Sequence, residues 1–429
     1  MKSNIPQSDK KRLVIVGGGF AGLKLATKLS GSDFQVILLD KNNFHQFQPL
    51  FYQVATSGLE PSSISFPLRK IFQKSKNVII RIAEVSSVDR GKKEILTSIG
   101  PISYDYLVIA FGADTNFFGM SHIREKAIPM KSVAEALSLR NTLLQNLEDA
   151  LNEQSSADLE GLMNIVVVGG GPTGVEISGT LAEMKRSVLP KDYPELNFSK
   201  MQIFLLEAGS KLLNGMTEHS SQKATQYLEN LGVKIWLNAQ VSDFDGINVS
   251  LHNGKSIRSN TLVWAAGVTG NRIAGLPEEA LARGNRIKVD RYSRVEGCEG
   301  IFALGDIAFM QEDAYPNGHP QMAQPAIQQA LLLSRNIKLM EKGEDPKPYS
   351  YFNKGAMATI GRNLAVVDLP FLSFQGFFAW LVWMFVHLMA IVGIKNRLLI
   401  FINWFWNYIT YDQSLRLIIK PYQKEKSGE

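Results

Sequence analysis

Two stretches of the chain repeat one short glycine pattern, and this repeat constrains the fold more than any other feature of the sequence. Residues 13–22 read LVIVGGGFAG and residues 165–174 read IVVVGGGPTG, so an apolar run leads twice into G-x-G-x-x-G. In a strand–turn–helix unit the first glycine allows a tight turn. The second lets the backbone approach a pyrophosphate, and the third lets the helix pack on its strand. The repeat therefore predicts two α/β dinucleotide-binding units in one chain.

An acidic residue follows each glycine turn at the end of the next predicted strand. The strand QVILLD ends at Asp40, and the strand QIFLLE ends at Glu207 after an insert, residues 189–200, whose proline and asparagine residues predict a loop. A carboxylate at this point accepts hydrogen bonds from ribose hydroxyl groups and repels a 2′-phosphate. Glu207 therefore favours NADH over NADPH in the second unit, with Lys211 as the nearest opposing charge.

Composition excludes several classes of function. The net charge of +6 is spread along 429 residues, and no nucleic-acid-binding motif accompanies it. The single cysteine, Cys298, rules out an intramolecular disulfide, a C-x-x-C redox pair and a cysteine-based metal site. The six histidines show no metal-ligand spacing. We therefore predict no nucleic-acid partner and no metal.

Later strands indicate that the chain leaves the first unit and returns to it. The strand in residues 104–113 ends at Gly112, and the strand in residues 300–306 ends at Gly305 and Asp306. Glycine at a strand end suits close approach to a cofactor. We therefore expect two Rossmann-like domains and a helical C-terminal region: a discontinuous first domain of residues 1–120 and 290–350, a second of residues 121–289, and a C-terminal membrane-anchoring region of residues 351–429.

The C-terminal region is rich in apolar and aromatic residues. Residues 377–394 are apolar except for His387 and Gly393, a borderline length for crossing a bilayer, and residues 398–409 carry Trp and Tyr suited to the headgroup zone. A crossing would place the basic tail on the far side from the cofactor domains, against the positive-inside tendency. We therefore expect a monotopic anchor on the cytoplasmic side of the cell membrane. A spanning helix, a buried core segment and a homodimer interface are the alternatives.

Four further motifs give the chain a resemblance to a known family. They are FQPLFYQVATSGLEP (47–61), LGD (304–306), AQPAIQQA (323–330) and AWLVWMFVHLMAIVGIKNRLLIFINW (379–404). With the two glycine turns, they make the chain resemble the type II NADH:quinone oxidoreductases, single-subunit, non-pumping flavoenzymes of respiratory membranes, over nearly its whole length. The resemblance implies tightly but non-covalently bound FAD in the first unit. It also implies NADH as substrate in the second unit and a quinone arriving from the membrane side.

The motifs and the resemblance together assign the cofactor-binding positions. Asp306 would hold hydroxyl groups of the flavin side chain, or else cap the following segment. His45 and Tyr52 could lie near the flavin or serve the structure alone. The assigned positions are Gly17, Gly19, Phe20, Ala21, Gly22, Asp40, Lys41, Gln53, Ala110, Gly112, Gly305, Asp306, Ala323 and Gln324 for FAD, and Gly169, Gly171, Thr173, Gly174, Glu176, Glu207, Ala266 and Gly267 for NADH.

Four residues are candidates for a direct part in the reaction. Glu176 is expected in the first turn of the second unit's helix, where a carboxylate favours the helix dipole, and the resemblance places it at the junction of nicotinamide and flavin. Gln324 and Gln328 share a helix face, and the resemblance implies that they line the quinone site; a solvated helix face is the alternative. Lys395 would border the quinone access or contact lipid phosphate.

The acceptor follows from the missing cysteines. Without a redox disulfide, electrons must pass from flavin directly to an outside acceptor. The resemblance implies a membrane quinone. The alternatives are a soluble NADH-dependent ferredoxin or rubredoxin reductase, and a flavoprotein like the apoptosis-inducing factors whose turnover is incidental.

Overall fold

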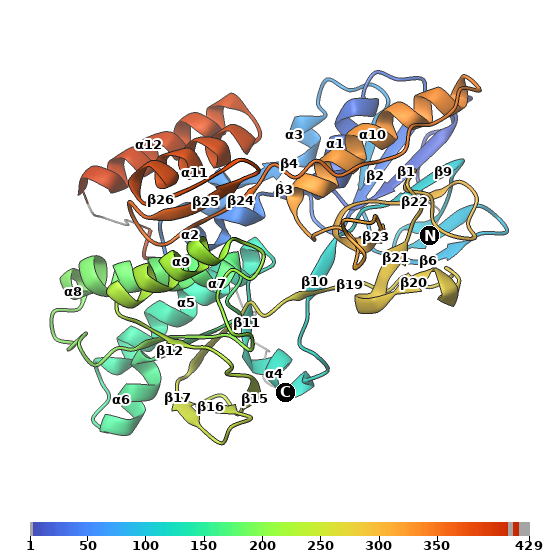
Figure 1. Cartoon of the computed structure of the whole chain (residues 1–429). Helices are drawn as coiled ribbons and strands as arrows, with labels where there is room; N and C mark the ends of the chain where they lie inside the picture. Colours follow the sequence, from blue (N-terminus) through green and yellow to red (C-terminus); the bar gives the residue numbers. More distant parts are fainter. Residues whose placement is uncertain (1–2, 411–414, 420–429) are drawn as a thin grey trace, which may run out of the picture. The chain divides into compact units, whose positions relative to one another are not determined.

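The computed structural model describes residues 3–410 and 415–419 and divides the chain into two compact units (Figure 1). Unit 1 contains the chain up to Gln46 together with Phe66–Asp114 and Val268–Lys354. Unit 2 contains Phe47–Ser65, Thr115–Gly267 and the chain from Gly355 onward. Both units are therefore discontinuous in sequence.

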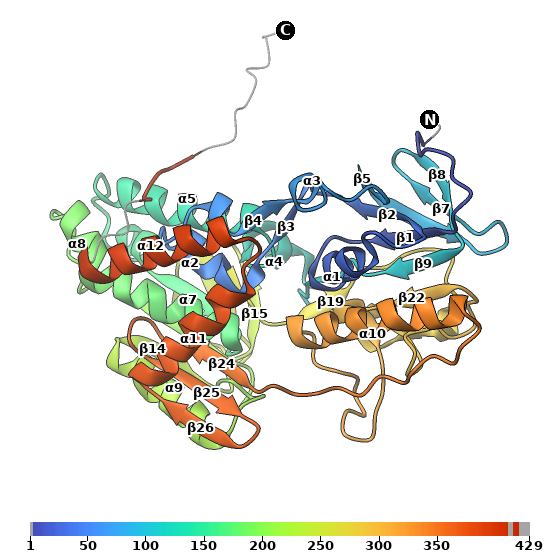
Figure 2. The same ribbon diagram turned by 90° about the horizontal axis from the view of Figure 1, so that it is seen from above.

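Unit 1 is built on a five-stranded parallel sheet in the order β22-β9-β1-β2-β5. The apolar run of β1 is buried at the centre of this sheet, as expected for a strand covered on both faces. Helices α1 and α10 pack against each other over the sheet (Figure 2). The bounds are β1 Arg12–Val16, β2 Gln35–Asp40, β5 Val78–Ile82, β9 Tyr106–Ile109, β22 Ile301–Ala303, α1 Phe20–Leu29 and α10 Ala323–Glu341.

Smaller elements complete unit 1. Strands β6, β7 and β8 form an antiparallel sheet, and β20, β21 and β23 form a second small sheet. Strands β3, β4, β10 and β19 and helix α3 lie in or next to the connections between the units. Their bounds are β3 Phe44–Gln46, β4 Ser65–Pro67, α3 Leu68–Ile71, β6 Val85–Asp89, β7 Glu94–Thr97, β8 Gly100–Ser103, β10 Ala113–Thr115, β19 Val268–Gly270, β20 Leu281–Ala282, β21 Arg286–Lys288 and β23 Ala308–Phe309.

Unit 2 repeats the same plan, with a five-stranded parallel sheet in the order β11-β18-β12-β13-β14. Helix α5 begins with a capping box, in which Ser132 and Glu135 satisfy each other's backbone N–H groups. The bounds are β11 Ile128–Pro129, α5 Val133–Ala150, α6 Ser156–Met163, β12 Ile165–Val168, α7 Pro172–Glu183, α8 Leu189–Asp192, β13 Ile203–Leu206, α9 Glu218–Asn230, β14 Val233–Trp236, β15 Val241–Phe244, β16 Asn248–Leu251, β17 Ser256–Arg258 and β18 Thr261–Trp264, with α2 Phe51–Ala55 and α4 Ser121–Lys126 before them.

The C-terminal part of unit 2 is an antiparallel sheet followed by two helices. The sheet has three strands, β24 Ala356–Thr359, β25 Ala365–Leu369 and β26 Leu372–Gln375. Residues 377–394 do not form one helix, because α11 Phe377–Ala390 ends at Ile391, whose backbone is extended (φ −64°, ψ 139°). Helix α12 follows at Ile394–Thr410.

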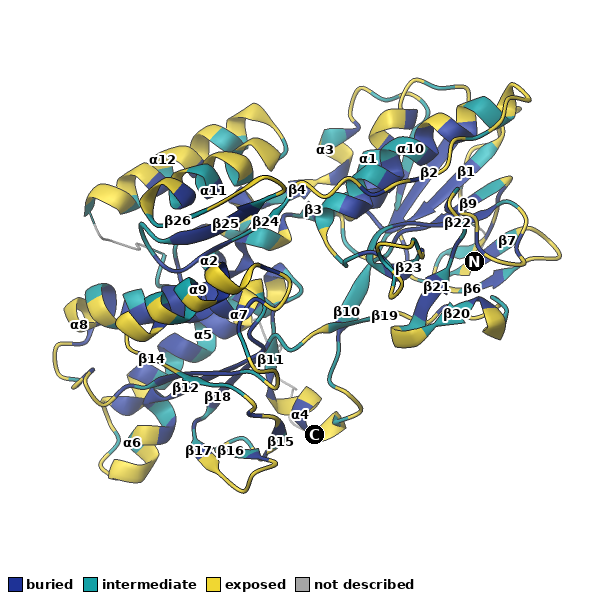
Figure 3. Cartoon of the chain, viewed as in Figure 1, coloured by how far each residue is buried: buried dark blue, intermediate teal, exposed yellow. Residues whose placement is uncertain are grey.

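Helices α11 and α12 each bury one narrow face. Trp383 on α11 and Trp404 on α12 are buried, whereas Phe378 and Phe385 are 75% and 65% exposed (Figure 3). Within residues 3–410 and 415–419, no helix combines the length and the apolar character needed to cross a bilayer.

Several boundaries differ from the sequence expectation. Residues 268–289 lie in unit 1, and the described C-terminal elements join unit 2 because β24 packs on α7 and β25 packs on α9. The insert 189–200 begins with the short helix α8 instead of being a loop throughout. Helix α7 ends at Glu183 and passes into a π-helical turn, Met184–Val188.

Candidate functional site

The glycine turn of unit 1 has the close packing that its pattern predicts. Gly17 has φ +106°, and a Cβ there would lie 2.5 Å from the carbonyl oxygen of Ala110. A Cβ on Gly22 would lie 1.8 Å from the carbonyl oxygen of Gly17, so helix and strand meet at backbone distance. A Cβ on Gly19 would meet no atom within 4 Å. Two glycines therefore serve packing, and the third leaves open space at the start of α1.

Asp40 and His45 hold the middle of this turn. One carboxylate oxygen of Asp40 accepts a hydrogen bond from the N–H of Gly18 at 2.6 Å, and the other accepts one from Asn42 at 2.7 Å. The ring Nδ1 of buried His45 lies 2.9 Å from the carbonyl oxygen of Gly18. Burial raises the pKa of Asp40 and lowers that of His45. His45 thus has a structural role in the turn.

The N-terminus of α1 fits a pyrophosphate. Gly19 is its N-cap, no side chain caps this end, and its first turn carries no acidic residue. The positive end of the helix dipole therefore faces the open space beside Gly19.

The other unit 1 candidates lie around Gly305 and the start of α10. A Cβ on Gly305 would lie 3.6 Å from Ala21, and its N–H donates to Gln329. The amide of Gln328 donates to and accepts from the backbone of Phe352. Gln324 accepts from the N–H of Lys354 at 3.2 Å. Both side-chain amides therefore contact the backbone that follows α10.

The glycine turn of unit 2 repeats that of unit 1 almost atom for atom. Cβ atoms on Gly169 and Gly174 would lie 2.4 Å from the carbonyl oxygen of Ala265 and 1.8 Å from that of Gly169, whereas one on Gly171 would meet nothing within 4 Å. Glu207 takes the place of Asp40, accepting from Gly170 at 2.5 Å. Both units therefore fit the phosphates of a dinucleotide.

Glu207 and Lys211 do not form an ion pair with each other. The second carboxylate oxygen of Glu207 accepts from the N–H of Gly209 at 2.6 Å. Lys211 forms an ion pair with Glu218 at 2.9 Å. The Glu207 carboxylate that holds this turn is therefore not paired with the nearest lysine.

Glu176 lies in the second turn of α7, because the helix begins at Pro172; the expected first-turn position is wrong. Its side chain is buried, and burial raises its pKa to about 8. The backbone N–H of Thr359 and the indole N–H of Trp383 favour the ionised form and oppose part of this rise. Glu176 therefore holds a proton at neutral pH.

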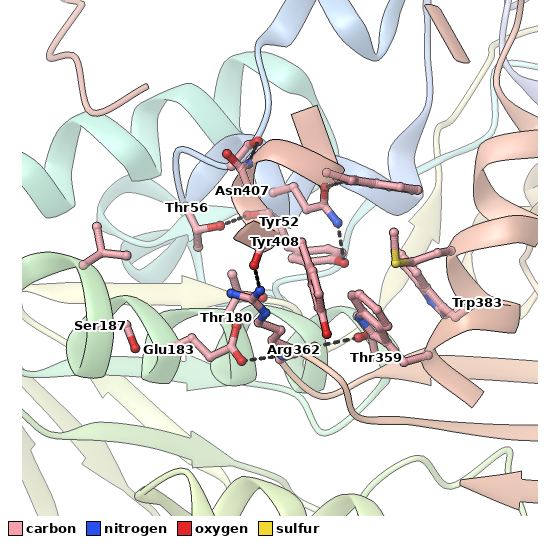
Figure 4. Close-up of a pocket in the computed structure, with 17 residues that line it drawn as sticks. Tyr52, Thr56, Thr180, Glu183, Ser187, Thr359, Arg362, Trp383, Asn407 and Tyr408 are labelled. Carbon is pink, nitrogen blue, oxygen red and sulfur yellow. Dashed lines mark hydrogen bonds between the residues drawn. The ribbon is translucent and has the colours of Figure 1, made fainter. Parts of the chain in front are cut away.

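A cavity of about 160 Å³ lies within unit 2, and Thr359 and Trp383 form part of its wall (Figure 4). Its walls come from α2, the end of α7, the β24–β25 turn, α11 and α12. Glu183 lies on the α7 side, accepts a hydrogen bond from the N–H of Arg362, and has its pKa raised by burial to about 7. The sequence expectations did not include Glu183 or Arg362.

Tyr52 and Gln53 line the same cavity from α2. The side chain of Gln53 donates to the Tyr52 hydroxyl at 2.9 Å and accepts from the Trp404 indole at 2.7 Å. The pKa of Tyr52 is raised well above 10 by burial and by the nearby charges of Glu176 and Glu183. Gln53, expected at FAD, thus links α2 to α12.

The expected residues are divided between the two units. Lys395 is exposed at the start of α12 and does not line the cavity. Unit 1 carries Gly17, Gly19, Phe20, Ala21, Gly22, Asp40, Lys41, Ala110, Gly112, Gly305, Asp306, Ala323, Gln324 and Gln328, and unit 2 carries Gln53, Gly169, Gly171, Thr173, Gly174, Glu176, Glu207, Ala266, Gly267 and Lys395.

Comparison with known families gives two matches that together cover most of the chain. Residues 11–330 match the pyridine nucleotide-disulphide oxidoreductase family, and residues 353–410 match the NDH2 C-terminal domain. Two relatives from Mycobacterium tuberculosis are type II NADH:quinone oxidoreductases, Ndh and NdhA, with 35% and 36% identity. The alignments cover 92% of this chain and 87% and 86% of those proteins.

Solved structures agree on the fold. The structure of NDH2 from Plasmodium falciparum in complex with NADH has a TM-score of 0.88 at 22% identity and covers 96% of this chain and all of that one. The sulfide:quinone oxidoreductase from Aquifex aeolicus has a TM-score of 0.71 at 18% identity and covers 88% of this chain and 90% of that one. The single cysteine here excludes a cysteine-pair route for electrons.

Proposed function

Because this chain belongs to the type II NADH:quinone oxidoreductase family, we propose that it oxidises NADH through bound FAD and reduces a membrane quinone to quinol without pumping protons. The observation that carries the proposal is the pair of matching glycine turns, each complete within its own unit. When bound, FAD accepts a hydride from NADH and passes two electrons on.

In unit 1, Asp40 and the open N-terminus of α1 support FAD. The Asp40 carboxylate fixes the turn through Gly18 and lies at the strand end where ribose hydroxyl groups are bound. Asp306 is the second residue of the short helical turn Gly305–Ile307 after β22 and would hold hydroxyl groups of the flavin side chain. These residues position the cofactor; they transfer no proton.

In unit 2, Gly171 and Glu207 support NADH. The space beside Gly171 admits the pyrophosphate, and the Glu207 carboxylate favours a free ribose 2′-hydroxyl over a 2′-phosphate. NADH is therefore the proposed substrate in preference to NADPH.

Glu176 is the proposed proton donor for the quinone. Its pKa of about 8 keeps the carboxyl protonated at neutral pH, as a general acid requires. Gln324 and Gln328 would hydrogen-bond the quinone carbonyl groups once their contacts to residues 352–354 rearrange. Lys395 would border the quinone access.

The exposed aromatic faces of α11 and α12 support monotopic attachment to a membrane. The cytoplasmic side of the cell membrane is the proposed location. Large apolar side chains that a water-soluble surface rarely gathers lie on both helices, among them Phe378, Phe385 and Trp406.

The test is to purify the protein in detergent, record a flavin spectrum, and measure NADH and NADPH oxidation with and without quinone. Fast NADH oxidation that depends on quinone supports the proposal, and absence of flavin refutes it.

Deleting the tail would uncover the core at Trp383, so substitution of surface residues is the sharper membrane test. F378S/F385S should keep activity with a water-soluble quinone but lose liposome binding, and K395A should lower quinone turnover rather than change lipid dependence.

A further inference from the structure

Reduction of a quinone requires a proton that NADH does not supply. NADH gives up a hydride, which carries two electrons and one proton, whereas a quinone becomes a quinol by taking up two electrons and two protons. One proton per turnover must therefore come from solvent. Glu176 is buried and must be reprotonated after each donation.

A second carboxyl, that of Glu183, lines the cavity of unit 2, and Glu176 lies behind the cavity wall at Thr359 and Trp383. Glu176, Thr180 and Glu183 follow one another on one face of α7, at spacings of four and three residues. Thr359 and Trp383, whose N–H groups favour the Glu176 carboxylate, also line the cavity. Glu183 lies in the wall of the same cavity and is partly exposed to solvent (Figure 4).

The distance between the carboxyls suits a short chain of water molecules. Seven residues of α-helix span about 10 Å, since each residue rises about 1.5 Å. A water molecule needs about 10–15 Å³ of such space, and the cavity offers about 160 Å³. Thr180 lies between the two carboxyls along the helix and lines the cavity, and its hydroxyl donates to the backbone carbonyl of Glu176 at 2.8 Å.

From this arrangement we propose that Glu183 is a proton-relay residue, which takes a proton from solvent and passes it through the cavity to Glu176. The proposal rests on the proposed function and deepens it. In each turnover the O–H bond of Glu183 breaks, protons shift along the water chain, and an O–H bond forms on Glu176. No electron moves along this path, and Glu183 then takes up a new proton from solvent.

The surroundings of Glu183 keep it able to exchange protons near neutral pH. Burial raises its pKa to about 7, while Arg362 and Arg186 oppose part of the rise. Tyr52 faces it from α2 and Tyr408 lines the cavity from α12; α11 contributes only Trp380, Trp383 and Met384. Burial raises the pKa values of both Glu176 and Glu183 from their ordinary value, so both carboxyls can hold a proton near neutral pH.

The backbone around Glu183 is built for close contact. A Cβ on Gly179 would lie 2.7 Å from the N atom of Gly361, so α7 meets the β24–β25 turn at backbone distance. This contact places the Arg362 N–H on the Glu183 carboxylate. The π-helical turn that follows α7 directs Ser187 and Val188 to the cavity, and such turns are frequent at functional sites.

Glu183→Gln in the holoenzyme tests the relay, because glutamine keeps the acceptor for Arg362 but cannot carry the proton. Quinone-linked turnover should fall about tenfold or more, in line with loss of a proton-transfer group. Ferricyanide takes electrons without protons, so NADH:ferricyanide turnover should stay within twofold. The quinone pH profile should lose its transition near pH 7, and Glu183→Asp should restore part of it. Glu229→Gln, an exposed glutamate on α9, should change neither rate.

Two results would overturn the relay: unchanged quinone turnover in Glu183→Gln, or a parallel loss of quinone and ferricyanide turnover, which indicates a structural defect. Failure of the proposed function has a different signature. The unsubstituted enzyme would then reduce ferricyanide but not quinone.

Discussion

A substitution at Gly171 should weaken NADH binding at the proposed site without lowering the stability of the fold. Its backbone has φ −73° and ψ −179°, an ordinary extended conformation, and an added Cβ would meet no protein atom within 4 Å. Gly171→Ala should therefore fold normally and gain about 0.4–1 kcal/mol from the stiffer unfolded chain. The new methyl group would nevertheless occupy the space proposed for the pyrophosphate.

The expected loss of affinity can be worked from this clash. Forcing a methyl group into a filled site costs about 1–3 kcal/mol, and about 1.4 kcal/mol is a factor of ten. The KM for NADH should therefore rise about 5- to 150-fold, with ferricyanide as acceptor so that quinone steps do not contribute. The melting temperature should not fall.

Gly174→Ala is the matched control, because its Cβ would lie 1.8 Å from the carbonyl oxygen of Gly169. This variant should lose stability, since neither backbone segment can yield without separating α7 from its strand. A Gly171→Ala enzyme with unchanged KM would refute the placement of the pyrophosphate. A Gly171→Ala enzyme that melts lower would refute the reasoning about space.

Further predictions concern three other residues. Glu207→Gln removes the charge that accepts from Gly170, so the preference for NADH over NADPH, measured as the ratio of kcat/KM values, should fall about tenfold or more; an unchanged ratio would place discrimination elsewhere. Wild-type quinone reduction should decline as the pH rises through about 8, where Glu176 loses its proton, and Glu176→Gln should show low activity without this decline. The pKa of this carboxyl is raised from 4.5 in the folded state, so its protonation stabilises the fold fully below pH 4.5 and the stabilisation disappears as pH rises through about 8. The free energy of unfolding in urea should therefore fall with pH over this range in the wild type and not in the glutamine variant. Trp404→Phe removes the 2.7 Å hydrogen bond to Gln53 and should lower the free energy of unfolding by about 0.5–1.5 kcal/mol, whereas an unchanged urea midpoint would contradict that contribution.

The two nucleotide units could be predicted from the sequence because their signals are local. Strand runs such as LVIV and IVVV and the glycine spacing determine each turn within about ten residues, and the Asp40 and Glu207 carboxylates meet the turns at the predicted strand ends. The two carboxylates also accept hydrogen bonds from the N–H groups of Gly18 and Gly170, a contact that binding of the ribose hydroxyl groups does not require.

The cavity was not predictable in the same way. Tyr52, Glu183 and Trp404 come from three distant segments, and only the packing of α2, α7 and α12 brings them together. The α7 sequence did carry one signal, because Glu176, Thr180 and Glu183 repeat at helical spacing. The end of α11 at Ile391 was also missed, since apolar composition alone does not report where the backbone leaves the helical conformation.

The strand order of unit 1 has a consequence for how the chain is synthesised. Strand β9 ends at residue 109, yet its outer neighbour β22 begins at residue 301. Until that part of the chain leaves the ribosome, β9 has one unpaired edge, a hazard for mispairing with other chains. The N-terminal half therefore cannot complete its sheet during early synthesis. A stalled or truncated product ending near residue 300 should aggregate, even though it contains both glycine turns.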